Sequence, residues 1–327
     1  MPESCSGGEV FLSDLSPKDK PWDKHRAASD KVSATYAAAG NPRYAERIKK
    51  CSLELEYVLK AGDLGDMIFR LNHAYFCRVR HCPTCQWRKS LKWKAKFIQA
   101  MPAVKEAYPT HRWLFLTLTV RNCELTELRN TINWMNTAFK RLTQLKIFPA
   151  VGWTRSIEVT RNSETNQAHP HFHCLLLVPA GYFDGKNYIN QEEWTELWKK
   201  CLRIEYTPIV HIKAIKSAKE WNFDEIWKAA VEIFKYAVKE EELFSNPEWL
   251  SELTNQLHKT KAVTIGGVLR GFLKDEKDDD DLIHVEESII LDEEDTGVHI
   301  FFGWRERVER YVQKRESILN PSIEEDS

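Results

Sequence analysis

Residues 169–177, "HPHFHCLLL", place a histidine at every second position and then continue into leucines. In a β-strand, side chains at positions i and i+2 lie on the same face. His169, His171 and His173 therefore share one face, and the leucines indicate that the strand is buried. A lone buried histidine is usually a hydrogen-bonded core residue, but two imidazoles at this spacing can converge on one metal ion.

A third ligand is expected from the preceding strand, 154–160 ("TRSIEVT"), in which Glu158 alternates with apolar residues. The polar segment "RNSETNQAHP" joins the two strands and predicts a hairpin that brings Glu158 beside His171 and His173. Two histidines and one carboxylate leave coordination positions open, which suits catalysis. These residues alone are compatible with zinc hydrolysis, non-haem iron, or Mg²⁺ or Mn²⁺ in phosphoryl chemistry.

Hydrophobic periodicity predicts an α+β fold around this hairpin. The expected strands are 113–120, 154–160, 171–178 and 209–215, and the expected helices are 125–145, 191–203 and 219–243. The order β-α-β-β-α-β, followed by a helix, predicts a split βαβ arrangement, that is, an antiparallel sheet with helices on one face. We expect an N-terminal helical region at 1–110, a central domain at 111–272, and an acidic segment with a C-terminal helix at 273–327.

The N-terminal region contains a cluster of cysteines. Cys82 and Cys85 form a Cys-x₂-Cys pair, and Cys77 lies five residues earlier. Because the chain lacks a secretion signal and a stretch of about 20 apolar residues, a cytoplasmic location and a metal site are expected, not disulfides or a membrane anchor. Cys51, His81 and His73 are the candidates for a fourth ligand of a structural Zn²⁺. Cys174 and Cys201 fit buried free thiols.

A basic segment, "QWRKSLKWKAKF" (86–97), follows the cysteines. Basic side chains repeat at helical spacing with interleaved tryptophans, which is typical of a DNA-binding surface, although such faces are often merely solvated. The candidate DNA-contacting residues are Arg88, Lys89, Lys92, Lys96 and Trp87.

The formal net charge of −1 hides an asymmetry. Residues 275–295 carry 12 acidic residues and one lysine, so the rest of the chain has a net charge near −1 + 11 = +10. The acidic run is either a solvated loop or an arm that competes with a polyanion for the basic body.

The expected helix 219–243 contains "VEIFKYAVK" (231–239). At 100° per residue, Glu232, Tyr236 and Lys239 lie on one face, opposite the apolar stripe. Taken alone, this trio is ordinary helix surface.

Together, "FLTLT" (115–119), "HPHFH" (169–173) and "EIFKYAVK" (232–239) resemble the three motifs of HUH endonucleases. Within these, the chain is similar to the single-tyrosine rolling-circle replication initiators of small bacterial plasmids, over roughly residues 12–270. The resemblance implies an HUH-type, ferredoxin- or RRM-like sheet and an upstream cysteine ligand, which favours Cys51.

The resemblance also implies a mechanism. His171, His173 and Glu158 would hold Mg²⁺ or Mn²⁺, and Tyr236, assisted by Lys239, would attack a phosphodiester of single-stranded DNA at the plasmid double-strand origin. The products would be a 5′-phosphotyrosine link and a free 3′-OH primer. Glu232 replaces the second tyrosine of many relatives and would activate a water for termination. Host helicase and DNA polymerase are the implied partners.

Three alternatives stay open. An HUH-type transposase would share these motifs, and a non-catalytic, zinc-containing DNA-binding regulator would share the cysteines and the basic helix. An oxygenase or hydrolase with two histidine ligands would leave Tyr236 and the basic helix unexplained. The sequence does not specify the oligomeric state.

Overall fold

The computed structural model describes residues 9–61, 67–215, 221–235, 238, 240–273, 282 and 297–314. By its contacts the chain divides into unit 1, Met1–Lys89 with Asp280–Ser327, and unit 2, Ser90–Asp279. The boundary falls inside helix α4 (Pro83–Ala107). The sequence predicts domain boundaries near residues 110 and 272, and these boundaries stay a prediction.

Unit 2 contains an antiparallel sheet with the strand order β6-β3-β5-β4-β7. Its strands are β3 (Arg112–Thr119), β4 (Gly152–Arg161), β5 (Ala168–Val178), β6 (Val210–Ala214) and β7 (Val263–Gly267). The four predicted strands are present, and β7 is an additional edge strand. With a second antiparallel sheet in unit 1, the predicted α+β class with antiparallel sheets is confirmed.

The helices of unit 2 are shorter in places than the sequence predicts. Beside the second part of α4 they are α5 (Leu128–Thr143), α6 (Gln191–Leu202), α7 (Phe223–Ile233), α8 (Glu240–Phe244), α9 (Pro247–Leu257) and α10 (Leu269–Phe272). A capping box between Asn190 and Glu193 sets the start of α6, as its sequence favours. The predicted helix 219–243 is wrong as a single element, because α7 ends at Ile233 and α8 is separate.

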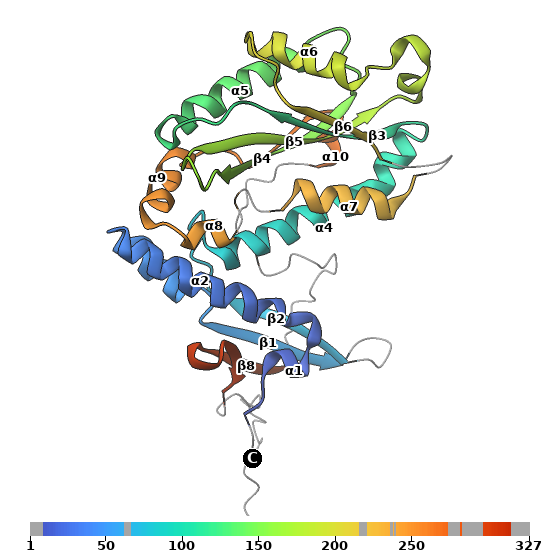
Figure 1. Ribbon diagram of the computed structural model, residues 1–327. Coiled ribbons are helices and arrows are strands. Elements are labelled where there is room, and N and C mark those ends of the chain that lie inside the picture. Colours follow the sequence, from blue (N-terminus) through green and yellow to red (C-terminus); the bar gives the residue numbers. More distant parts are fainter. Residues whose placement is uncertain are drawn as a thin grey trace, which may run out of the picture. The chain divides into compact units, whose positions relative to one another are not determined.

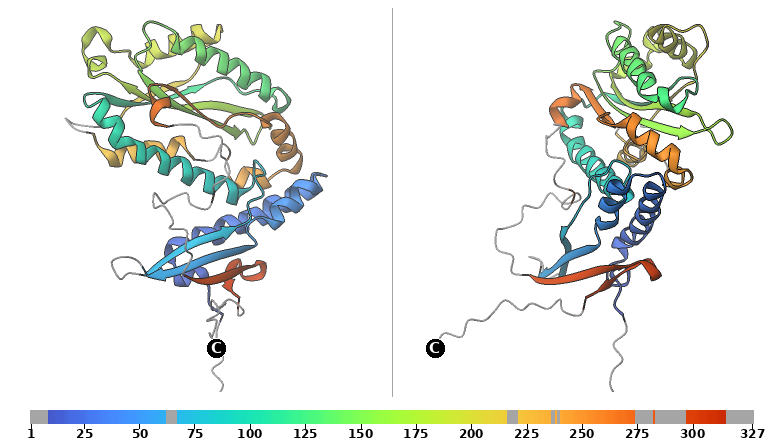
Figure 2. Two further views of the ribbon diagram at one scale, coloured as in Figure 1. Left: turned by 180° about the vertical axis from the view of Figure 1, so that it is seen from behind. Right: turned by 90° about the vertical axis from the view of Figure 1, so that its left-hand side faces the viewer.

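Helices cover both faces of this sheet, not one as predicted (Figure 1, Figure 2). On one face, Phe172 of β5 contacts the rings of Phe139 in α5 and Trp198 in α6. On the other face, Leu175 and Leu177 of β5 share a buried cluster with residues of α4 and α7. The physical reason is the continuous apolar run in β5, which must be buried in both directions.

Unit 1 is built from N-terminal helices and a four-stranded sheet of order β2-β1-β8-β9. Its helices are α1 (Leu12–Leu15), α2 (Pro21–Ala38), α3 (Pro42–Lys50) and the start of α4, and its strands are β1 (Glu54–Ala61), β2 (Met67–Ala74), β8 (Val298–Arg305) and β9 (Arg310–Gln313). Trp22 of α2 packs with Leu55 and Tyr57 of β1 and with Phe302 of β8 in its core.

Residues 297–314, the longest described stretch of the predicted segment 273–327, form strands β8 and β9 with a 3-10 turn between them. The predicted C-terminal helix does not lie in this stretch and otherwise falls on residues outside the described part. Strand β8 pairs with β1 from Glu54↔Gly303 to Leu59↔Val298, a pairing between distant parts of the chain that no local pattern reveals. Of the acidic run 275–295 only Leu282 is described, and residues 315–327 also lie outside the described part.

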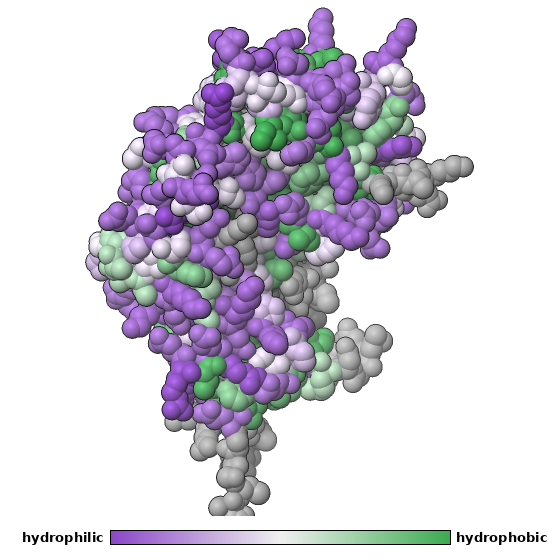
Figure 3. Space-filling model, in the orientation of Figure 1, coloured by the Kyte–Doolittle hydropathy of each residue, from purple (hydrophilic) through white to green (hydrophobic). Residues whose placement is uncertain are grey.

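Hydrophilic residues cover much of the face drawn in Figure 3. Among the described residues, no helix is long and apolar enough to cross a membrane.

Candidate metal centre and cysteine cluster

The register of the β4–β5 hairpin brings the predicted ligands together. Glu158 pairs directly with His171, and Ser156, on the same face of β4, pairs with His173. Glu158 Oε2 lies 3.2 Å from His171 Nε2 and 2.8 Å from His173 Nε2. Glu158 and His173 are buried, and His171 is nearly so. We call these three residues the triad.

The triad has the geometry of a metal site. Its ligand atoms all lie within 4.8 Å of one another. Two ligands held about 2.1 Å from one ion at a right angle would be about 3 Å apart, close to the distances observed here. The donor set of two imidazoles and one carboxylate therefore fits a divalent ion with open coordination positions.

The electrostatics of the triad keep its carboxylate ionised. Burial opposes the charged form of Glu158, but hydrogen bonds with His171, His173 and Lys235 outweigh it and hold the pKa of Glu158 well below its ordinary value. An ionised carboxylate is the form that binds a metal ion.

Neighbouring groups orient the two imidazoles. Thr117 Oγ1 of β3 lies 3.2 Å from His173 Nδ1, and the backbone oxygen of His169 lies 3.3 Å from His171 Nδ1. Both contacts engage Nδ1 and leave Nε2 directed at Glu158. The ring of His169 instead contacts Asn122 Oδ1 at 2.7 Å, so this third histidine is not part of the triad.

Lys235 was not predicted as a site residue, yet it contacts the triad. Its Nζ lies 3.0 Å from Glu158 Oε2 and 2.5 Å from Glu232 Oε1. Burial opposes its charge, but the hydrogen bonds with Glu232 and Glu158 raise the pKa of Lys235. Lys235 thus links the partly exposed carboxylate of Glu232 to the triad. Tyr236 and Lys239 lie outside the described residues.

The predicted face of Glu232, Tyr236 and Lys239 assumed one continuous helix. The structure ends α7 at Ile233, and Phe234 has left the helical conformation with φ −99° and ψ 11°. Phe234 stacks on Trp93 of α4 at 5.8 Å between ring centroids. These tertiary contacts, together with the Lys235–Glu158 pair, outweigh the local helix propensity that the sequence pattern measures.

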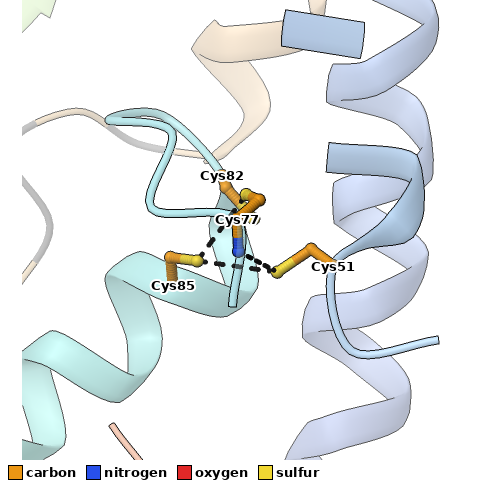
Figure 4. A group of neighbouring side chains, drawn as sticks. All are labelled: Cys51, Cys77, Cys82 and Cys85. Atoms are coloured by element: carbon orange, nitrogen blue, oxygen red, sulfur yellow. Dashed lines mark hydrogen bonds between the residues drawn. The ribbon is translucent and has the colours of Figure 1, made fainter. Parts of the chain in front are cut away.

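Four cysteines converge in unit 1 (Figure 4). Cys51 follows α3, Cys77 lies in the loop after β2, Cys82 precedes α4, and Cys85 lies in its first turn. Their Sγ atoms all lie within 4.8 Å, with 3.5 Å between Cys51 and Cys85 and 3.7 Å between Cys77 and Cys85. Four thiolates about 2.3 Å from a tetrahedral ion would be about 3.8 Å apart, so the cluster fits a metal ion.

The surroundings of the cysteine cluster favour a thiolate at Cys82, whereas hydrogen bonds with neighbouring thiols raise the pKa of Cys51 and of Cys85. The backbone N–H groups of Cys77 and Arg78 donate to Cys51 Sγ and Cys85 Sγ, at 3.4 and 3.3 Å. Burial opposes ionisation of Cys82, but hydrogen bonds with the other three thiols lower its pKa. Of the alternative ligands, His81 is buried outside the group and His73 is exposed. Cys174 and Cys201 are buried free thiols, as predicted.

The candidate DNA-contacting residues differ in environment. Arg88 is buried in unit 1, where its Nε donates to the backbone oxygen of Leu282 and its guanidinium lies over the rings of Trp22 and Trp87. Trp87 packs edge-on against Trp22. The three lysines of this set, Lys89, Lys92 and Lys96, are half-buried.

The fold and the site define an α+β protein with a two-histidine, one-carboxylate triad and a four-cysteine cluster. The sequence profile of the family described as "Replication protein" matches residues 68–312. The chain belongs to this family of replication proteins.

The curated relatives agree with this assignment. "Protein rep" of Streptococcus pneumoniae is 31% identical over 307 residues, covering 91% of this chain and 93% of that protein. "Protein rep" of Bacillus amyloliquefaciens is 32% identical over 332 residues, covering 91% and 95%. "Protein rep" of a Bacillus species is 39% identical over 228 residues, covering 65% and 72%. No solved structure gives a significant match.

Proposed function

We propose that this replication protein initiates rolling-circle replication of a plasmid by nicking single-stranded DNA at the double-strand origin. The observation that carries the proposal is the triad of Glu158, His171 and His173 on adjacent strands of a chain from the Rep family. In this proposal the sheet of unit 2 is an HUH-type sheet, and the protein acts in the cytoplasm.

Mg²⁺ or Mn²⁺ is the proposed ion of the triad. When bound, the ion would polarise the scissile phosphodiester and stabilise the negative charge that develops on its oxygens. The chain supplies the two imidazoles in one tautomer and the ionised carboxylate of Glu158. Zn²⁺ is the proposed ion of the cysteine cluster, where four protein ligands leave no open position and the role is structural.

Tyr236 is the proposed nucleophile. Its phenolic oxygen would form a bond to phosphorus while the bond between phosphorus and the 3′ oxygen breaks, and the 3′ oxygen would take up a proton. The products are a 5′-phosphotyrosine link and a 3′-OH for a host polymerase, with a host helicase as a second partner. Lys235 directly precedes Tyr236 in the sequence, and its Nζ lies 3.0 Å from Glu158 Oε2. This contact supports the proposal that Tyr236 acts close to the triad. Lys239 would favour the phenolate or orient the phosphate.

Glu232 is the proposed termination residue. A carboxylate can deprotonate a water molecule that hydrolyses a phosphodiester. Its 2.5 Å contact with Lys235, which also contacts Glu158, supports a location beside the reacting phosphate.

The basic segment that starts in the first turns of α4, with Lys89, Lys92 and Lys96, is the proposed contact for the DNA backbone. Arg88 and Trp87 support that helix within unit 1.

The alternatives predict different results. The similarity to proteins named "Protein rep" supports a replication initiator over a transposase. A non-catalytic DNA-binding regulator would bind origin DNA without forming a covalent adduct.

The deciding experiment mixes the protein with labelled single-stranded origin DNA and Mn²⁺ and looks for a protein–DNA band that survives denaturation. We expect the unsubstituted protein to form the band, and Tyr236→Phe and Glu158→Ala to lose it. A control substitution at another tyrosine, Tyr188→Phe, which lies exposed in a loop, should keep it. An adduct that persists in Tyr236→Phe would refute the assignment of the nucleophile.

A further inference from the structure

A large groove lies in unit 2 beside the edge strand β7, apart from the triad. It has a volume of about 790 Å³ and is bordered by α5, by the turn after α9, by β7 and by α10. Helix α10 contacts both β4 and β7. Among the described lining residues none is acidic, and five carry a positive charge. They are Lys140, Arg155, Lys259, Lys261 and Arg270.

The key residue of the groove is Arg155 of β4. This residue is only 6% exposed, and its Nε has no hydrogen-bond partner among the residues that the structure describes. Its Nη2 donates to Asn136 Oδ1 at 2.7 Å, and its guanidinium lies over the rings of Phe139 and Phe172. Within the described part of the chain, no carboxylate lies within ion-pair distance of Arg155. A buried guanidinium without a carboxylate is costly unless an anion binds there.

The rest of the groove fits a chain of phosphates better than a single anion. Lys140, Lys259 and Arg270 are exposed and come from three different elements, so their charges are spread along the groove. Trp153 and Trp93, both half-buried, also line it and offer aromatic surface. A basic track with interleaved aromatic side chains is the combination that binds single-stranded nucleic acid.

The groove leads toward the triad along β4. Arg155 and Glu158 lie three residues apart on this strand, on opposite faces of the sheet. At the edge, Ser156 pairs with Val263. The backbone N–H of Ile157 donates to the backbone oxygen of Ala262 at 3.0 Å, so Glu158 and Lys261, which follow and precede these two residues, lie at the same end of the pairing between β4 and β7. A polyanion in the groove could therefore continue round the edge of the sheet to the metal ligands.

We infer that this groove binds the phosphate backbone of the single-stranded DNA that flanks the nicked phosphodiester. The inference rests on the proposed function and adds a binding surface to it. Phosphate oxygens would approach the guanidinium of Arg155 and the surrounding lysines, and the unpaired bases would lie against the indole of Trp153.

The test compares two variants with the same loss of charge. Lys140→Gln/Lys259→Gln removes two cations of the groove, and Lys146→Gln/Lys186→Gln removes two exposed cations of unit 2 outside it. Binding of a labelled single-stranded origin oligonucleotide is measured by fluorescence anisotropy over a range of salt concentrations. We expect the groove variant to raise Kd roughly tenfold at low salt and to lower the salt slope by about 1.4, or about 0.7 per lost phosphate contact. The control variant should bind like the unsubstituted protein.

The outcomes separate this inference from the proposed function. If the unsubstituted protein binds and forms the covalent adduct but both variants bind alike, the groove inference fails and the proposed function stands. If the unsubstituted protein binds the oligonucleotide without forming an adduct, the nicking function fails, while a weaker groove variant still supports the groove. A groove variant that loses affinity for duplex but not for single-stranded DNA would overturn the assignment to single strands.

Discussion

A single contact, between Thr117 and His173, orients one imidazole of the triad. A histidine that binds a metal through Nε2 carries its proton on Nδ1, and the 3.2 Å contact allows that Nδ1–H to donate to Thr117 Oγ1. Only the pairing of β3 with β5, Thr117↔His173, brings the two together. The hydroxyl therefore fixes the tautomer that metal binding needs.

We predict that Thr117→Val weakens metal binding without disturbing the fold, because valine has the shape of threonine but cannot accept the Nδ1–H. The Kd for Mn²⁺, measured by isothermal titration calorimetry, should rise at least tenfold. Thr117→Ser, which keeps the hydroxyl, should restore most of the affinity. Equal Mn²⁺ affinity in Thr117→Val and the unsubstituted protein would exclude this role.

Glu232 can be tested against a matched ion pair on the same helix. Both Glu232–Lys235 and Glu225–Lys228 join residues three positions apart, at 2.5 and 2.6 Å, but only the first reaches the triad. We predict that Glu232→Ala still forms the tyrosyl adduct but releases it at least 100-fold more slowly, because the base for water is lost.

The measurement follows the adduct over time on denaturing gels after a pulse of labelled DNA. Glu225→Ala should form and release the adduct at the unsubstituted rate. Normal release by Glu232→Ala would assign termination to another group.

At the scale of elements, the edge strand β7 depends on a glycine. Gly266 pairs with Trp153 of β4, and a Cβ at Gly266 would lie 2.1 Å from the indole. The indole therefore occupies the space that a side chain at Gly266 would need, and Trp153 also lines the groove. A larger residue must displace the indole or the strand.

We predict that Gly266→Ala destabilises the protein by about 1–3 kcal/mol, the usual cost of overpacking. Gly271→Ala in α10, where no atom of the described residues lies within 4 Å of the added Cβ, is the control and should be neutral or slightly stabilising. Chemical denaturation followed by tryptophan fluorescence gives both free energies. Equal stability of the two variants would show that the indole moves aside at little cost.

At the scale of the whole molecule, the cysteine cluster joins segments that are distant in sequence. Cys51, after α3, meets Cys77, Cys82 and Cys85 around the start of α4. A bound Zn²⁺ would hold the helices of unit 1 against its sheet, and its binding energy would count as folding energy. Unit 1 should therefore depend on metal more strongly than unit 2.

We predict that Cys82→Ser loses tightly bound zinc and unfolds unit 1 at a lower temperature, because structural zinc contributes on the order of 10 kcal/mol in small zinc-dependent peptides. Zinc content from a chromogenic chelator and thermal unfolding by circular dichroism are the measurements. Cys123→Ser, at a half-buried cysteine outside the cluster, should keep both values. Full zinc content in Cys82→Ser would show that the cluster does not hold zinc.

The sequence by itself determined the α+β class, the four central strands, the three triad residues and the three closely spaced cysteines, Cys77, Cys82 and Cys85. It left the fourth member of the cysteine cluster open between Cys51, His81 and His73, and only the family resemblance favoured Cys51. These features follow from local periodicity and short spacings: alternate histidines must share a strand face, and a hairpin must bring Glu158 to them. The closely spaced cysteines likewise indicated a common site.

Only the tertiary structure decided the rest. In the tertiary structure α7 ends at Ile233, and Lys235 contacts Glu158. Strands β7 and β8 pair with β4 and β1. Helices lie on both faces of the central sheet. Arg88 is buried in unit 1, and Arg155 is buried beside the groove. The physical reason is the same in each case: these outcomes depend on contacts between residues far apart in the chain, which outweigh local propensity and leave no periodic signal in the sequence.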